Sequence, residues 1–174
     1  MLITNKDLTI RTANIDDAKM LGKWWRNGII MAHAGYPNGL KISDYEIAEQ
    51  ISSESDENCR RLIIEIENIP IGEMMYRVLD KGTAEIGIKI CVLSQQEKGY
   101  GSQFIKMLVT DLFNNLGFEK IVLDTNLNNL RAQHVYEKIG FCKTQINIDS
   151  WKNQLGKLES SVEYELLKEN FITN

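Results

Sequence analysis

The alternation of apolar and polar positions predicts three consecutive strands in the middle of the chain. They cover residues 61–67, 71–79 and 84–92, and short polar turns separate them. In the third run the apolar side chains share one face, whereas Glu85 and Lys89 lie on the other. Such short connections favour an antiparallel meander.

A spacing of three and four residues between apolar positions predicts four helices. Either Asp16 or Asp17 can cap the first, which ends before residue 28. A capping box from Ser43 to Glu46 opens the second. Gly117 and Gly140 are expected to end the later two. These later helices cover residues 101–116 and about 129–138.

Short apolar runs complete the predicted set of elements. They indicate further strands at residues 8–11, 121–123, 144–148 and 162–166. The order β-α-α-β-β-β-α-β-α-β-β contains no repeat and no linker. It predicts a single α/β domain over residues 1–174, with a mixed, mostly antiparallel sheet flanked by helices.

Composition excludes several classes of protein. The chain has 174 residues, of which 43% are hydrophobic and only two are proline, which disfavours disordered and collagen-like chains. The longest apolar runs, Ile29–Ala32 and Ile90–Leu93, are far below the roughly 20 residues of a membrane span. Residues 1–17 carry no basic segment before an apolar run, so we expect no signal peptide, a cytoplasmic location and no membrane partner.

Charge and cysteine content disfavour one class of partner and two kinds of site. A net charge of −4 without a Lys/Arg cluster disfavours nucleic acid as a partner. Cys59, Cys91 and Cys142 are widely spaced, so we expect three buried, reduced, structural thiols and no metal or disulfide set. His33 and His134 are too far apart in sequence to suggest a metal pair.

The most informative segment is Q-E-K-G-Y-G-S, residues 96–102, between a predicted strand and a predicted helix. Two glycines let the backbone turn sharply and approach a ligand closely. The unpaired N–H groups of the following helix then suit a phosphate or pyrophosphate. Alone, such a glycine pair is also compatible with an ordinary turn, and it matches neither a Walker loop nor a dinucleotide fingerprint.

A second motif begins 28 residues after Gly101. Asn129 and Tyr136 lie seven positions apart, so both project from nearly one face of the predicted helix. This places an amide two turns from a phenol that can donate a proton. The plain alternative is a helix cap at Asn129 and a core tyrosine at Tyr136.

Together, Q-x-x-G-x-G at the head of one helix and N-x-x-A-x-x-x-Y-x-x-x-G-F on the next resemble the GNAT superfamily of N-acetyltransferases. The order of elements is similar to that fold from about residue 8 to residue 167. The resemblance implies an acyl-CoA N-acyltransferase (GNAT) fold, acetyl-CoA as acetyl donor, and transfer to a primary amine without a covalent enzyme intermediate. A non-catalytic acyl-CoA-binding or sensing domain of the same fold is the alternative.

The resemblance also implies a set of cofactor-binding residues. The strand end would pair with the pantetheine arm, and one of its amides would polarise the thioester carbonyl. The loop would wrap the pyrophosphate, with Glu97 pointing outward because it stands where the family commonly has glycine. Asn129 would contact the arm. The strand-end residues are Ile90, Cys91 and Val92, and the loop residues are Gln96, Glu97, Lys98, Gly99, Tyr100, Gly101 and Ser102.

Two side chains match catalytic positions of the family. Tyr136 matches the usual general acid, which would protonate the departing thiolate. Glu85 lies 16 residues before Gly101, a spacing similar to that of the base glutamate in the histone-acetylating branch. A base is needed because a primary amine, with a pKa near about 10, is mostly protonated at neutral pH.

The acceptor is the least defined partner. By resemblance it binds opposite the cofactor, and we expect His33 and Tyr36 to bind it, with wall residues among Trp24, Trp25 and Trp151. The sequence leaves open a small-molecule amine or a protein N-terminus. It also leaves open a homodimer.

Overall fold

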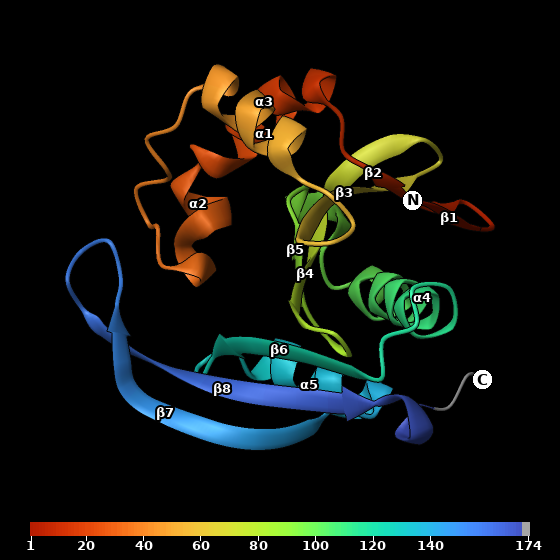
Figure 1. Ribbon diagram of the computed structural model, residues 1–174. Coiled ribbons are helices and arrows are strands. Elements are labelled where there is room, and N and C mark those ends of the chain that lie inside the picture. Colours follow the sequence, from red (N-terminus) through yellow and green to blue (C-terminus); the bar gives the residue numbers. More distant parts are fainter. Residues whose placement is uncertain (172–174) are drawn as a thin grey trace.

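The chain folds around one eight-stranded sheet with the strand order β1-β2-β3-β4-β5-β6-β8-β7 (Figure 1). A computed structural model describes residues 1–171. Neighbouring strands pair antiparallel except β5 and β6, which are parallel. The strands are β1 (Leu2–Asn5), β2 (Leu8–Thr12), β3 (Cys59–Ile66), β4 (Ile69–Asp80), β5 (Thr83–Ile90), β6 (Lys120–Asn126), β7 (Cys142–Lys152) and β8 (Leu158–Leu167).

Helices cover both faces of this sheet. In β3, Leu62 and Ile64 point to the core shared with α4 and α5, whereas Ile63 between them points to the core under α1 and α3. Because successive side chains of a strand point to opposite faces, β3 contributes to two separate cores. The helices are α1 (Ala18–Trp25), α2 (Gly28–Met31), α3 (Asp44–Ser53), α4 (Tyr100–Asn114) and α5 (Leu130–Ile139).

The parallel pair β5 and β6 is joined over a short length only. Their register covers residues 83–85 against 120–122, and beyond it the two strands part, as Figure 1 shows. The later halves of both strands, residues 86–90 and 124–126, line one cleft. The split in the sheet therefore creates the candidate site.

The structure confirms every predicted strand and helix, with ends shifted by a few residues. The capping box from Ser43 to Glu46 is formed, and Gly140 closes α5 in a left-handed conformation, φ +114°. The predicted order was incomplete, because it omitted β1 and the single-turn helix α2, which are too short to show a clear period.

Two local predictions were wrong. Neither Asp16 nor Asp17 caps the first helix through its side chain: Asn14 caps the short 3₁₀ turn before α1, and the Asp17 carboxylate accepts hydrogen bonds from Arg11. The cysteines are not all buried, since Cys142 is exposed on the edge strand β7. Among residues 1–171, no helix combines the length and the apolar character needed to cross a membrane.

Candidate active site

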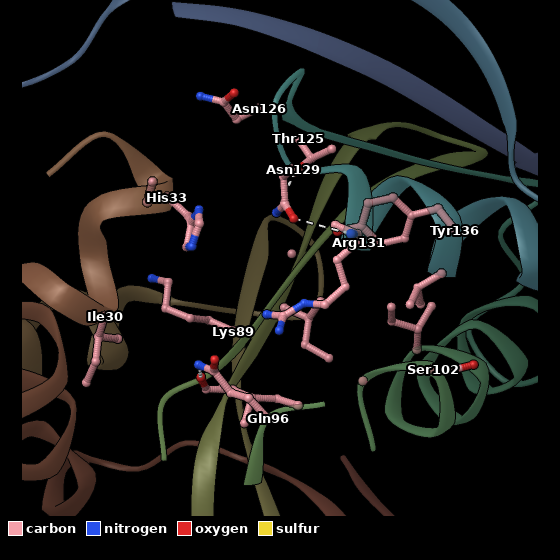
Figure 2. Close-up of a pocket in the computed structure, with 18 of the residues that line it drawn as sticks. Ile30, His33, Lys89, Gln96, Ser102, Thr125, Asn126, Asn129, Arg131 and Tyr136 are labelled. Carbon is pink, nitrogen blue, oxygen red and sulfur yellow. Dashed lines mark hydrogen bonds between the residues drawn. The ribbon is translucent and has the colours of Figure 1, made fainter. Parts of the chain in front are cut away.

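A cleft of about 690 Å³ opens where β5 and β6 part. Its walls come from the free halves of these strands, the first turns of α4 and α5, and α2 with the 3₁₀ turn that follows it. Figure 2 shows His33, from that turn, across the cleft from Tyr136 of α5. This volume is within the range of small-molecule sites, roughly 300–1,000 Å³.

The N-terminus of α4 opens into this cleft. Gly99 precedes the helix in a left-handed conformation, φ +81°, and, lacking a side chain, leaves the first-turn amides without the usual N-cap partner. Gly99, Gly101 and Ser102 all line the cleft. Unpaired N–H groups at the positive end of a 15-residue helix suit a phosphate group.

The outer half of β5 turns backbone groups toward the cleft, because β6 pairs only with residues 83–85. The N–H groups of Cys91 and Val92 both donate to the Ile71 carbonyl of β4, at 2.8 and 2.9 Å. Alternate peptide groups of a strand point to opposite edges, so the N–H of Ile90 faces away from β4, toward the split. Gln96 donates from Nε2 to the Ile90 carbonyl at 2.8 Å and so ties the glycine loop to this strand end.

An ion pair joins the glycine loop to α5. Arg131 donates to the Glu97 carboxylate at 2.7 Å, and both residues line the cleft. The Glu97 side chain is 76% exposed and its backbone has φ +62°. The pair therefore balances a negative charge that would otherwise lie next to the open end of α4.

Helix α5 places two polar side chains along the cleft. Asn129 caps the helix by accepting from the Ala132 N–H at 3.2 Å, and its amide donates to Thr125 at 3.3 Å. Tyr136 lies two turns later with 8% exposure, its ring packed on Tyr164. Burial, followed by the charge of Asp124, raises the pKa of Tyr136 to about 12.

Asp124 lies in the outer half of β6, and its carboxylate, like that of Glu97, lines the cleft. Its side chain is open to the cleft, yet the pKa of Asp124 is raised because protein surrounds it and because Glu85 and Glu163 add like charge. Asp124 thus lies near two further carboxylates outside the cleft lining, and the charge of Arg77, which pairs with Glu85, partly offsets them.

Comparison with known proteins decides the family. A model of the acetyltransferase (GNAT) domain matches residues 7–142. The chain belongs to the GNAT acetyltransferase family. Aminoglycoside N(6′)-acetyltransferase type 1 of Klebsiella pneumoniae is 28% identical to this GNAT domain over 151 residues, which cover 79% of this chain and 75% of the relative.

Solved structures share the fold of this GNAT domain. Spermidine N-acetyltransferase from Vibrio cholerae, in complex with CoA and spermine, superposes with a TM-score of 0.86 at 22% identity, over 97% of this chain and 100% of that one. An aminoglycoside acetyltransferase in complex with coenzyme A superposes with a TM-score of 0.75 at 24% identity, over 94% and 96% of the two chains.

The GNAT cleft is lined by seven of the eleven residues expected to bind the cofactor. Lys98 instead bonds Gln95 at 3.2 Å, and Tyr100 and Val92 pack against the core. Cys91 is buried, and burial, with the charge of Glu73, raises the pKa of its thiol to about 12. Those that line the cleft are Ile90, Gln96, Glu97, Gly99, Gly101, Ser102 and Asn129.

The cleft lining contains some of the residues expected for catalysis and acceptor binding but not others. Tyr136 lines the cleft, whereas Glu85 forms an ion pair with Arg77 of the neighbouring strand. His33 and Trp151 line the cleft as well. Tyr36 is 40% exposed on the loop after α2. Of the tryptophans considered for the wall, Trp25 is buried and donates to Glu73 at 2.8 Å.

Sequence reasoning missed Asp124 and Arg131, both of which line the cleft. A usable signal existed for Asp124, since it directly follows the buried apolar run of residues 121–123, in the strand before the Asn129 helix. The place of Asp124 in the cleft depends on the split between β5 and β6, and its raised pKa depends in part on the charges of Glu85 and Glu163. Those come from other strands, so the sequence around Asp124 does not reveal them.

Proposed function

We propose that the protein is an acetyl-CoA-dependent N-acetyltransferase that acetylates a primary amine by direct attack in a ternary complex. The observation that carries the proposal is that one cleft joins the open N-terminus of α4 to the side chain of Tyr136. An anion-binding helix end and a proton donor in one cleft suit a long anionic thioester.

The donor would lie along the split between β5 and β6. The first-turn amides of α4 would hold its pyrophosphate, and the free N–H of Ile90 would donate to the thioester carbonyl. Two structural relatives are solved with coenzyme A, which supports this choice of donor. Cys91 would take no part as a nucleophile, because a thiol with a pKa near 12 is not ionised at neutral pH.

The acceptor amine has to lose a proton before it attacks. We assign that proton to Asp124, whose raised pKa makes it a stronger base than an ordinary aspartate. Glu85, held by Arg77, supports this by adding negative charge. The assignment of Glu85 itself as base stays a prediction, and comparison of Asp124→Asn with Glu85→Gln separates the two.

Tyr136 would give a proton to the departing sulfur. Its pKa of about 12 keeps the hydroxyl protonated at neutral pH, so the proton is available when the thiolate leaves. Free thiols have pKa values near about 8.5, and the sulfur therefore needs a donor or solvent to leave as a thiol at neutral pH.

We infer a small polycationic amine as acceptor. The acidic charge at Asp124, reinforced by Glu85 and Glu163, favours a cation. Relatives named for spermidine and for aminoglycosides support this class. A protein N-terminus is the alternative acceptor, and the assay below includes it.

A thiol-release assay with acetyl-CoA tests the proposal against polyamines, aminoglycosides, amino acids and peptides. Tyr136→Phe is expected to lower kcat by about 10²-fold or more while acetyl-CoA binding is retained. Tyr45→Phe is the matched control, because this tyrosine is exposed on α3, bonds Glu49 at 2.8 Å and lies outside the cleft lining.

Each other outcome has a definite meaning. Equal kcat for wild type and Tyr136→Phe would remove Tyr136 from the reaction. Binding of acetyl-CoA without turnover of any amine would favour the non-catalytic sensing domain. Absence of binding at millimolar acetyl-CoA would refute both readings.

A further inference from the structure

Two segments more than a hundred residues apart meet beside the part of the cleft that His33 and Trp151 line. We call this part the acceptor end. The turn between β7 and β8 reaches the loop that follows α2, at the left of Figure 1. Gln154 makes the connection: its N–H donates to the Gly35 carbonyl at 2.8 Å, its Oε1 accepts from the Asn38 N–H at 2.9 Å, and its Nε2 donates to the Gly39 carbonyl at 2.9 Å. We call this connection the Gln154 bridge.

The loop half of the bridge has little room to move. Gly35 has φ +90°, and a Cβ on it would lie 2.4 Å from the Trp151 ring. At its other end the loop is tied to α1, because Leu40 donates to the Trp25 carbonyl at 2.7 Å. Packing against Trp151 at one end and a hydrogen bond to α1 at the other therefore restrict residues 35–39.

The hairpin half is fixed to the cleft by a chain of hydrogen bonds. Asn153 accepts from two amides of its own turn, at 2.9 and 3.1 Å. Its side-chain amide donates to Glu159 at 3.0 Å, and Asn126 donates to the same carboxylate at 3.2 Å. Asn126 lines the cleft at the end of β6, so the turn is connected to the cleft wall.

Each half of the bridge also supplies a wall of the acceptor end. His33 and Ala34 line the cleft from the side of α2, and Trp151 lines it from β7. The spacing between these walls therefore depends on the contact between the two halves. Gln154 makes that contact with three backbone groups of one loop.

We propose that Gln154 is a specificity-determining positioning residue that sets the width of the acceptor end and so selects amines by their cross-section. This rests on the proposed acetyl transfer to an amine. While the hydrogen bonds of Gln154 hold the two halves together, only an acceptor of small cross-section fits between His33 and Trp151. With the side-chain contacts removed, the two walls separate and discrimination by size weakens.

Gln154→Ala tests the proposal through two independent readouts. The first is steady-state kinetics with spermidine and kanamycin as slender and bulky acceptors. Loss of two hydrogen bonds is expected to raise KM for the preferred acceptor about tenfold and to shrink the kcat/KM ratio between the two amines by a similar factor. KM for acetyl-CoA is expected to be unchanged, because its proposed contacts lie at α4 and β5.

The second readout is hydrogen exchange of the loop. The Asn38 amide loses its acceptor in Gln154→Ala, so peptides containing residues 35–40 are expected to exchange faster than in the wild type. Leu155→Ala, next in the same turn and 66% exposed, is the matched control and should change neither readout.

The outcomes separate this proposal from the proposed function. Faster exchange with an unchanged acceptor ratio would overturn the role of Gln154 in selection, and unchanged exchange would overturn the bridge itself. A wild-type protein that turns over no amine would overturn the proposed function, and the selectivity with it.

Discussion

At the scale of one side chain, the charge proposed to act as base at Asp124 also acts against stability. The pKa of Asp124 is raised above its ordinary value of 3.8 by surrounding protein and by the like charges of Glu85 and Glu163. Between the unfolded and folded pKa values the folded state therefore binds more protons. The contribution of Asp124 to stability is therefore highest at low pH, and it declines as the pH rises from the unfolded to the folded pKa of this group.

We therefore expect Asp124→Asn to raise Tm near pH 8, with the gain shrinking as the pH falls toward about 4. The same variant should lower kcat/KM for the acceptor at least about tenfold, because a cation-binding carboxylate is lost. Thermal unfolding across pH and steady-state kinetics measure the two effects. A lower Tm at pH 8 would contradict the assignment.

At the scale of elements, the glycine loop before α4 and the first turn of α5 are joined by one exposed ion pair. We expect Arg131→Gln to raise KM for acetyl-CoA several-fold, because Glu97 is then left unpaired beside the proposed pyrophosphate site. Glu97→Gln removes that negative charge and should leave KM unchanged or lower. Both variants should keep Tm within about 2 °C, since exposed pairs contribute little to stability.

Titration of acetyl-CoA at low and high salt checks this prediction. The effect of Arg131→Gln should weaken as salt screens the carboxylate. An equal loss of affinity in both variants would show that the ion pair matters for loop geometry, and not for charge.

Elements with a regular pattern were predictable from the sequence, whereas two four-residue elements, α2 and β1, were not. Helix α4 repeats its apolar stripe over 15 residues, whereas α2 has four residues and β1 has four. The glycine loop and Tyr136 could be found because each carries a local motif. The Gln154 bridge could not, because its partners are about 115 residues away and bond through their backbones.

At the scale of the whole molecule, the site depends on how the sheet is divided. The parallel contact between β5 and β6 stops after three residue pairs, and both outer halves become walls of the cleft. The net charge of −4 offers no general attraction for an anionic donor. Donor binding would therefore rely on local features, namely the first-turn amides of α4, and the proposed acceptor would lie toward Asp124 in the outer half of β6.

The proposed activity is transfer of an acetyl group from acetyl-CoA to an amine bound in this cleft. Mass spectrometry of the acceptor after incubation with the protein and acetyl-CoA tests it most directly, with free CoA measured in the same sample. We predict an N-acetylated amine and an equal amount of free CoA, both strongly reduced with Tyr136→Phe. Free CoA without acetylated amine would contradict the proposed transfer, and equal product from Tyr136→Phe would contradict the proposed role of Tyr136.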